Sequence, residues 1–400
     1  MSDKEFCKFI IYPVSRTLYF GSSLSIETGG VGYTRVLPPP STLAGMIRGA
    51  LLSEDPNVIF DSKLFGKEIN GDYYYDFTGW RIIGPYLIYD GNTRVLYYPL
   101  PLLFLAKKEA EKKEIVLIKP TRDHLELLKG IDASAHDYIL VPNFRFTDKG
   151  IEDLDFSEGF IKMEYLMDLL SGKRDEIEVK EEDFPIVILG SLSRKLEDAG
   201  ILKIERTIGI GLDYKKKTIK IEEGRGHTYV TAKIALASQW KYFFAIIADE
   251  DVADRIRNAL DGKILRLGGR GSLVEVKEVS DVEMIEEKLW EEGFLENEFL
   301  LYFTNPAVLS DDRGLDTFDL TRASKGALEV KAYAIKQTLI SGWSIKKKMI
   351  RETHFGIEMG SSYFVKLKTS DYTYQNLLFD RFFVNEKYRG AFGSCLIGYI

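Results

Sequence analysis

The chain has 400 residues, is 45% hydrophobic and 29% charged, and carries a formal net charge of −7. No apolar run is long enough to span a bilayer, and the charged N-terminus lacks the hydrophobic region of a signal peptide, which predicts a cytoplasmic protein. Cys7 and Cys395 are the only cysteines, which excludes a disulfide framework and a cysteine zinc cluster, and no cofactor is expected. The length predicts two to three domains.

Charge is distributed unevenly along the chain. Lys331–Arg351 and Lys263–Val274 contain basic residues and no acidic ones, whereas acidic residues concentrate in Glu152–Asp183 and Asp281–Glu298. A free-standing nucleic-acid binder is usually basic overall, so the net charge counts against that class. The distribution predicts a basic groove with acidic outer flanks.

The first elements are a strand and a helix. Phe6–Val14 is a short apolar run rich in β-formers, and PPPSTLAGMIRGALL then has apolar residues at helical spacing, with Ser41 as the expected N-cap. Arg48 lies off the apolar stripe of this helix. Gly45 and Gly49 cost helix stability, which predicts a close approach to their face, with packing on a sheet as the simplest cause.

The middle of the chain, from about residue 60 to 225, follows no simple pattern. It contains a predicted hairpin, WRIIGPYLIYDGNTRVLYYPLP, a helix opening near Ser157 and a charged, flexible stretch over Gly172–Asp183. Beyond it, TYVTAKIALA and WKYFFAIIAD are predicted as paired strands, DVADRIRNALDG as a helix closed by Asp261-Gly262, and SLVEVKEV as a strand.

Without the middle, the order is strand, helix, strand, strand, helix, strand, as in a ferredoxin-like domain. The last hundred residues repeat this order loosely, with strands predicted in FLLYFTNPAVL, VKAYAIKQTL, WSIKKKMI, SSYFVKLK and SCLIGYI. The expected fold is therefore α+β, with two ferredoxin-like (RRM-like) domains over residues 1–282 and 292–400. A large insertion at about 60–225 lies in the first.

Lysines cluster in the C-terminal part. The turn ISG separates two β-like runs, so Lys331 and Lys336 are predicted to face Lys346–Lys348 across a hairpin. Like charges opposed in this way are destabilising, which indicates an anion beside them. A solvated edge strand guarded by lysines is the alternative.

Enzyme motifs are not found. The loop LGGRGS (Leu267–Ser272) lacks the Gly-Lys-Ser/Thr of a Walker loop, and it is predicted to run from helix to strand, the reverse of the order that phosphate-binding motifs require. The four histidines are scattered, which favours structural roles over metal binding: His124, His136, His227 and His354. A metal-free ribonuclease needs one histidine with a lysine or tyrosine, and His227 follows a basic segment.

The glycine loop has two interpretations. Its backbone N–H groups, together with Arg266 and Arg270, suit the phosphates of a single nucleic-acid strand, and its glycines remove the Cβ atoms that would hold a sugar-phosphate backbone away. Taken alone, the loop is more typical of a tight turn that needs positive φ.

Four segments in order, PPPSTLAGMIRGALL, RTIGIGLDYKKKTIKIEEGRGHTYV, LGGRGSLVEV and IEMGSSYFVKL, resemble landmarks of the RAMP superfamily. The chain is most similar to the subunit family of type III-B (Cmr) CRISPR effector complexes that holds the 5′ handle of the guide RNA. The resemblance implies two ferredoxin-like domains and no catalytic centre. It also implies a cap-like position beside the large polymerase-type subunit and the helical backbone subunit.

The resemblance also assigns RNA-binding positions, to which the residue-based analysis adds Arg266 and His227. The basic segment ends in Gly-Arg-Gly-His, where the family pattern has Gly-His/Leu-Tyr, so Arg225 departs from it. The positions implied are Arg48, Arg206, Lys215, Lys216, Lys217, Arg225, Gly268, Gly269, Arg270 and Gly271.

Two functions from different classes follow. The first is a non-catalytic subunit that binds the 5′ handle of CRISPR RNA. The second is a metal-independent RAMP endoribonuclease that processes the precursor RNA. The predicted first helix has no histidine, which favours the first function.

Overall fold

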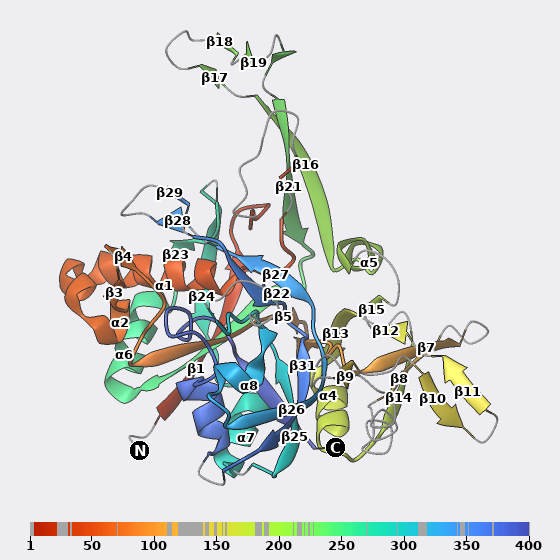
Figure 1. The fold of residues 1–400 in the computed structure, drawn as a ribbon. Coiled ribbons are helices and arrows are strands. Elements are labelled where there is room, and N and C mark those ends of the chain that lie inside the picture. The colour runs from red at the N-terminus through yellow and green to blue at the C-terminus, as the bar shows by residue number, and fades with distance from the viewer. Residues whose placement is uncertain are drawn as a thin grey trace.

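In the computed structural model, the chain forms an α+β structure around two larger, mainly antiparallel sheets, with smaller sheets and hairpins at the periphery (Figure 1). The predicted α+β class is confirmed. The structure describes residues 4–399 except 22–30, 33, 70, 110–113, 119–138, 141–143, 148–149, 154, 157, 181–185, 188–191, 211, 214–217, 220, 223–224, 227, 270, 294, 311–317, 342, 345–348, 351 and 370–371.

The first sheet has eight strands in the order β15-β13-β6-β5-β22-β1-β24-β23, and each adjacent pair is antiparallel. Its middle strands are largely buried on both faces, as their near-continuous apolar runs require. The bounds are β1 Lys4–Pro13, β5 Trp80–Asp90, β6 Arg94–Pro99, β13 Glu158–Lys162, β15 Ile186–Val187, β22 Trp240–Asp249, β23 Lys263–Arg266 and β24 Leu273–Glu278.

Helices α1 (Pro40–Glu54) and α6 (Glu250–Leu260) pack against each other and cover one face of this sheet. In chain order, the central elements are β1, α1, β5, β22, α6 and β24, while in space the strands lie β24-β1-β22-β5. The hairpin predicted around Asp-Gly-Asn is confirmed, because Asp90 pairs with Arg94. Helix α6 ends at Asp261 as predicted, and Gly262 has φ +67°.

The second sheet has the order β32-β25-β31-β26-β9. Its strands β25, β26, β31 and β32 repeat the spatial order of the first sheet's central strands, and β9, which comes from the middle of the chain, pairs in parallel with β26. The bounds are β9 Ile139–Leu140, β25 Glu298–Phe303, β26 Leu328–Ala334, β31 Ser362–Leu367, β32 Cys395–Gly398, α8 Leu320–Ala323 and the π-helix η4 Asn376–Asp380.

Buried polar side chains join the two sheets. Helix α7 (Ile285–Glu292) lies between them, and its Glu286 accepts hydrogen bonds from the hydroxyls of Tyr86 and Tyr98, the second at 2.8 Å. Arg81 donates to the carbonyl of Phe379, and Arg381 donates to the carbonyl of Ile82, each at 2.6 Å. These reciprocal contacts, one from each half of the chain, hold the two sheets together.

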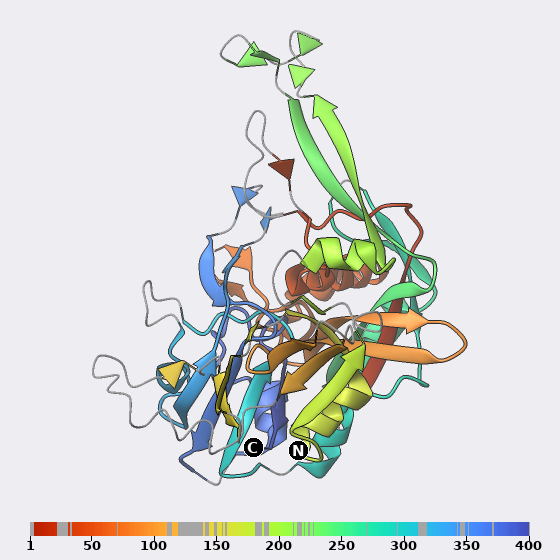
Figure 2. The same ribbon diagram turned by 90° about the vertical axis from the view of Figure 1, so that its right-hand side faces the viewer.

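Strands β16 (Leu202–Ile210) and β21 (Thr228–Leu236) form a ribbon that projects from the sheets, with α5 (Leu192–Asp198) at its base (Figures 1 and 2). The segment TYVTAKIALA therefore pairs with β16. The prediction from the sequence that it pairs with WKYFFAIIAD was wrong. The remaining elements are β2 Val31–Gly32, η1 Pro56–Phe60, α2 Ser62–Phe65, β3 Glu68–Ile69, β4 Asp72–Tyr73, β7 Leu105–Glu109, β8 Glu114–Ile118, β10 Phe144–Thr147, β11 Gly150–Asp153, β12 Asp155–Phe156, α4 Met163–Leu170, β14 Glu176–Lys180, β17 Leu212–Asp213, β18 Thr218–Ile219, β19 Ile221–Glu222, β20 Arg225–Gly226, β27 Gln337–Ile340, β28 Trp343–Ser344, β29 Met349–Ile350 and β30 His354–Ile357.

Several local predictions were wrong. Helix α1 begins at Pro40, with Pro39 as its N-cap, because proline needs no hydrogen bond for its nitrogen at N1. A Cβ added at Gly45 or Gly49 would meet no atom within 4 Å, so neither glycine permits a close approach within the chain. The helix expected near Ser157 begins later, because β13 pairs with β6 first. The charged stretch at 172–183 contains β14, which alternates buried and exposed residues.

The predicted lysine hairpin does not form in the expected register. Lys331 lies on β26, where its ammonium pairs with Glu329, and β27 pairs with β30. The turn therefore does not set Lys331 or Lys336 opposite Lys346–Lys348, which lie outside the described residues.

Candidate nucleic-acid interface

The glycine loop is a turn between two strands. Strand β23 separates it from helix α6, so the loop joins β23 to β24, and the prediction that it follows a helix directly was wrong. The Leu267 N–H donates to the Ser272 carbonyl at 3.0 Å and closes the turn. Gly268 and Gly271 have φ +78° and +74°, so the tight-turn interpretation holds for both positions.

The backbone that approaches this loop is the chain's own. A Cβ at Gly268 would lie 2.4 Å from the Tyr19 carbonyl oxygen, and the Gly269 N–H donates to that oxygen at 3.0 Å. Gly271 differs, because a Cβ there would meet no atom of the described residues within 4 Å. Gly268 is therefore required by internal packing, whereas the described residues leave the space beside Gly271 open.

The segment Val14–Phe20 connects the loop to the projecting ribbon. On the loop side, the Val14 N–H donates to the Leu273 carbonyl at 3.0 Å. On the ribbon side, Leu18 and Ile234 exchange backbone hydrogen bonds of 2.7 and 2.9 Å. The glycine loop and the ribbon, about 30 to 70 residues apart in sequence, are thus fixed relative to one another.

Exposed arginines lie along this connection. Arg206 is exposed on β16, opposite Ala232. Arg16 was not predicted from the sequence; its side chain is 81% exposed, and its guanidinium pairs with Glu205 at 2.6 Å. A basic residue just after the end of the first strand was the signal that could have identified it. Arg266 is exposed on β23, on the face of the sheet that also presents Leu273.

Arg48 does not belong to this exposed set. It is only 7% exposed, its guanidinium donates to the carbonyls of Tyr73 and Tyr74, and the rings of Phe65 and Phe77 lie 5.0 and 4.8 Å from it. Its role in this structure is to hold the segment after α2, which contradicts a direct contact with RNA. A guanidinium off an apolar stripe can still be buried when carbonyls and rings surround it.

The other predicted positions are not placed. Arg270 and His227 lie outside the described residues, and of Arg225 only the backbone, in β20, is described. The same holds for the three lysines of the basic segment: Lys215, Lys216 and Lys217 lie outside the described residues.

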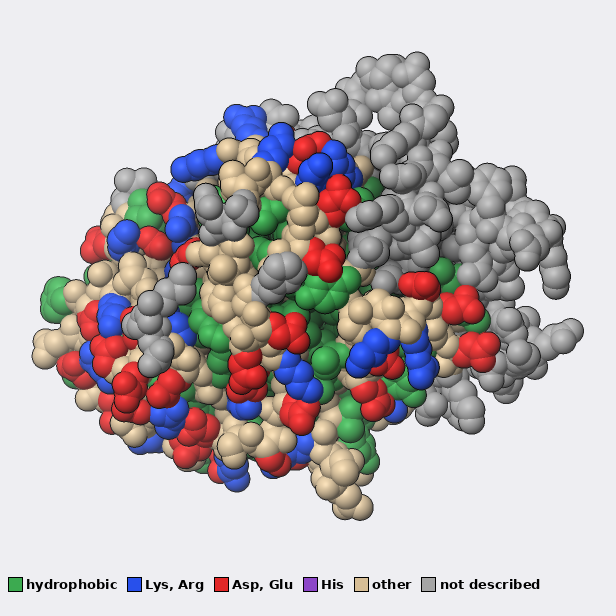
Figure 3. Space-filling model, turned by 90° about the horizontal axis from the view of Figure 1, so that it is seen from below, with side chains coloured by type: hydrophobic (Ala, Val, Ile, Leu, Met, Phe, Trp, Pro, Cys, Tyr) green, Lys and Arg blue, Asp and Glu red, His purple; other side chains and the backbone are tan. Residues whose placement is uncertain are grey.

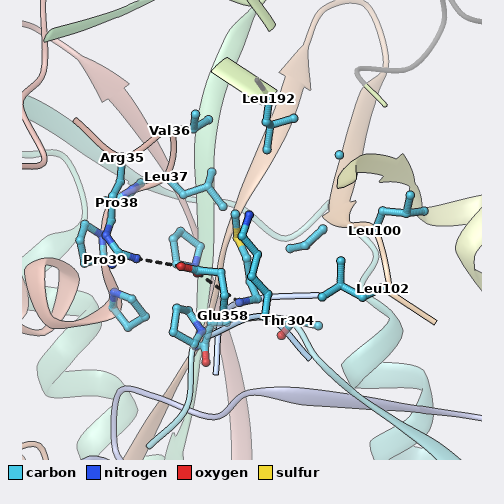
Figure 4. A pocket seen from close by; sticks show the side chains of 18 of the residues that line it. Arg35, Val36, Leu37, Pro38, Pro39, Leu100, Leu102, Leu192, Thr304 and Glu358 are labelled. Atoms are coloured by element: carbon cyan, nitrogen blue, oxygen red, sulfur yellow. Dashed lines mark hydrogen bonds and ion pairs between the residues drawn. The ribbon is translucent and has the colours of Figure 1, made fainter. Parts of the chain in front are cut away.

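A cleft of about 410 Å³ opens between the two sheets (Figure 4). The Arg35 N–H donates to the Phe20 carbonyl at 3.1 Å, so the cleft begins where the Val14–Phe20 segment ends. The Arg35 guanidinium pairs with Glu358 at 3.3 Å on one wall, Lys336 also lines the cleft, and prolines form much of the rest. The cleft is therefore joined to the glycine loop through the Val14–Phe20 segment, and the charged residues that line it are Arg35, Lys336 and Glu358.

Metal-ligand clusters and ionised thiols are not found among the described residues. No group of three or more His, Cys, Asp or Glu side chains that could hold a metal is found among them. Burial raises the pKa of the Cys7 thiol to about 11 and that of Cys395 to about 12, so neither ionises near neutral pH. His354 is buried against Tyr388.

The surface charge is mixed away from the ribbon. On the face seen in Figure 3, lysine, arginine and acidic side chains are interspersed, which agrees with the chain's negative net charge. Within the described ranges, no helix is both long and apolar enough to cross a membrane.

The chain is similar to a known protein family and to chains of solved structures. A family model described as "CRISPR-associated protein (Cas_Cmr3)" matches residues 27–399, and no curated protein matches the sequence. A chain in the cryo-EM structure of the type III-B Cmr-beta complex bound to cognate target RNA is 19% identical, with 89% of this chain and 86% of that chain covered and a TM-score of 0.45. A chain in the crystal structure of the Csm3-Csm4 subcomplex of the type III-A CRISPR-Cas interference complex is 12% identical, with 98% and 99% covered and a TM-score of 0.40. Because the family model spans almost the whole sequence, the chain belongs to the CRISPR-associated Cas_Cmr3 family, the RAMP subunits of type III-B (Cmr) effector complexes that bind the 5′ handle of the guide RNA.

Proposed function

We propose that the 5′ handle of the guide RNA lies across the open side of the glycine loop, between the β16–β21 ribbon and the cleft. The observation that carries this proposal is the Val14–Phe20 segment, which fixes the loop to the ribbon through backbone hydrogen bonds. The carbonyl of its last residue, Phe20, accepts a hydrogen bond from the Arg35 backbone N–H. Exposed guanidinium groups of Arg16 and Arg206, together with backbone at Gly271 that has open space beside it, suit the phosphates of a single strand.

The RNA-binding set proposed here differs from the one expected from sequence. Arg48 is left out because it is buried, and Arg266 is left out because it lies on β23, on the face of the sheet that also presents Leu273. From the sequence, we retain Arg206 and the loop glycines, and we keep the residues outside the described ranges as proposals: Lys215, Lys216, Lys217, Arg225, His227 and Arg270.

We further propose that both halves of the chain are ferredoxin-like domains. In each sheet, the four principal strands have the spatial order 4-1-3-2 relative to the chain, all antiparallel, which is the order of that fold. The domain limits proposed are 1–282 and 292–400, with α7 at the junction. The insertion proposed lies between β5 and β22, because β5, which the sequence placed inside it, is a principal strand of the first sheet and β22 begins at Trp240.

The chain acts, on this proposal, as a non-catalytic cap of the complex. It contacts the large polymerase-type subunit and the helical backbone subunit, and it positions the guide RNA without cleaving it. Membership of the Cas_Cmr3 family supports this role.

Charge reversal tests the RNA path. Complexes assembled with Arg206→Glu or Arg270→Glu should retain less guide RNA, and each loss should flatten the dependence of log K on log salt by at most about one unit. Arg174→Glu is the matched control. Arg174 is an exposed arginine that follows α4, and its guanidinium forms an ion pair with Asp168 at 3.6 Å. Full guide RNA content in both test variants at moderate salt would show that the loop and ribbon do not bind RNA.

A further inference from the structure

Arg35 joins the two halves of the chain at the cleft. Its backbone is fixed to the first half, because the Arg35 N–H donates to the Phe20 carbonyl at 3.1 Å. The hydroxyl of Tyr242, on β22, donates to the next carbonyl, that of Val36, at 2.8 Å. The guanidinium of Arg35 reaches the second half, where it forms an ion pair with Glu358 at 3.3 Å (Figure 4). One side chain therefore connects the two walls of the cleft.

The same guanidinium holds the hairpin formed by strands β27 and β30, which we call the β27–β30 ribbon. Its Nη2 donates to Thr338 Oγ1 at 3.1 Å and to the Leu339 carbonyl at 3.3 Å, both on β27. Glu358 directly follows β30, and its N–H donates at 2.7 Å to the carbonyl of Lys336, which directly precedes β27. Arg35 thus contacts the ribbon both at its base and along its first strand.

These contacts commit the guanidinium to the protein. Its N–H groups are arranged in a rigid planar fork, and Nη1 and Nη2 already have acceptors on the second half. The Arg35 side chain is 35% exposed, whereas that of Arg16, in the proposed RNA-binding set, is 81% exposed. A phosphate that bound Arg35 in the same plane would have to displace Glu358 or the ribbon.

We propose that Arg35 is a positioning residue for guide-RNA binding. It fixes the β27–β30 ribbon relative to the Val14–Phe20 segment, so that the second wall of the cleft is held in place beside the glycine loop, and it does not itself contact RNA. A surface that is fixed before binding loses less entropy when the RNA binds. This proposal rests on the RNA path proposed above. Direct contact between Arg35 and a phosphate is the alternative.

Substitution of Glu358 distinguishes the two roles by the sign of its effect. Glu358→Gln breaks the ion pair while it makes the surface beside the cleft more positive. If Arg35 is a positioning residue, assembled complexes should bind guide RNA about fivefold more weakly, the factor that one ordinary hydrogen bond gives. If Arg35 contacts a phosphate, release of its guanidinium should leave binding equal or make it tighter, and that result would overturn the proposal.

Two further variants control for charge. Thr338→Val removes an acceptor of Arg35 without a change of charge, and it should weaken guide-RNA binding in the same direction as Glu358→Gln. Glu278→Gln removes the same charge as Glu358→Gln from another partly buried pair, in which Glu278 accepts from Arg257 at 2.7 Å within the first half. Binding of guide RNA should be unchanged in Glu278→Gln.

Arg35→Gln provides a second test through salt dependence. Guide-RNA binding should weaken about fivefold with an unchanged slope of log K against log salt, whereas loss of a phosphate contact would flatten that slope by about one unit. The amide of Glu358 should also exchange about fivefold faster, because the base of the ribbon loses its support. A residue that only stabilises the fold would change this exchange and leave guide-RNA binding per assembled chain unaltered.

The proposal and the RNA path fail separately. Unchanged guide-RNA binding in Arg35→Gln, or a slope flattened by about one unit, would overturn the positioning role even if Arg206→Glu and Arg270→Glu lose guide RNA. Full guide RNA content in those two charge-reversal variants would instead contradict the path across the glycine loop.

Discussion

Substitution of alanine at three glycines with positive φ distinguishes the effect of internal packing from the effect of RNA binding. Gly268, Gly271 and Gly326 have φ between +74° and +83°, so each substitution costs about 1–2 kcal/mol for the left-handed backbone. At Gly271 and Gly326, none of the described residues has an atom within 4 Å of the added Cβ, so that cost is the expected effect on stability. At Gly268, the Tyr19 carbonyl oxygen would have to move away from its 2.4 Å position, which adds about 1–3 kcal/mol for overpacking.

Local exchange is the appropriate assay, because a chain of this length need not unfold in one step. In Gly268→Ala, the amide of Gly269, which donates to Tyr19, should exchange roughly 5- to 150-fold faster than in Gly271→Ala, as 1–3 kcal/mol requires. Guide RNA content should fall in Gly271→Ala, where the Cβ enters the proposed RNA path, and stay normal in Gly326→Ala. Equal exchange in the first two variants would refute the packing argument, and normal guide content in Gly271→Ala would refute the RNA path beside it.

Three further predictions follow from buried groups and from the alternative function. Arg381→Met should destabilise the chain by at least about 3 kcal/mol in urea denaturation, because it leaves buried carbonyl acceptors without a donor. Burial raises the pKa of Glu286 from 4.5 to about 7, so folding favours the protonated carboxyl group. The free energy of unfolding should therefore fall as the pH rises from about 4.5 to 7, and then level off. Glu286→Gln should remove up to about 3 kcal/mol of that pH dependence in parallel denaturation series. The isolated chain should not cleave repeat RNA, and cleavage that is abolished in His227→Ala would support the endoribonuclease function.

The sequence predicted the elements with strong local patterns. The apolar runs of β1, β5, β22 and β24 and the helical stripes of α1 and α6 were recognised, because burial on a sheet imposes a period that local residues reveal. The short strand β23 was missed, since Lys263–Arg266 has no alternation and is defined by pairing with β24. Strand β21 was assigned the wrong neighbour because pairing across an insertion leaves no local signal.

The candidate site was predictable only in part. The glycine loop was identified from composition, but composition does not distinguish a glycine required by the chain's own backbone from one beside open space. Gly268 belongs to the first kind and Gly271 to the second, and only the position of Tyr19 separates them. Arg48 was selected by its place in a motif, whereas its burial depends on carbonyls of Tyr73 and Tyr74 that lie 25 and 26 residues further along the chain.

The packing of Gly268 against Tyr19 couples the loop to the ribbon mechanically. Tyr19 adjoins Leu18, whose backbone exchanges hydrogen bonds with Ile234 of β21, so a displacement of the loop is transmitted to the base of the ribbon through two consecutive residues. Phe20 extends the same connection to Arg35 and the cleft. A single strand of RNA that contacts the loop therefore meets a surface whose parts are already fixed relative to one another, which reduces the entropy lost on binding. A glycine needed for internal packing therefore lies three residues from one beside which the described residues leave open space.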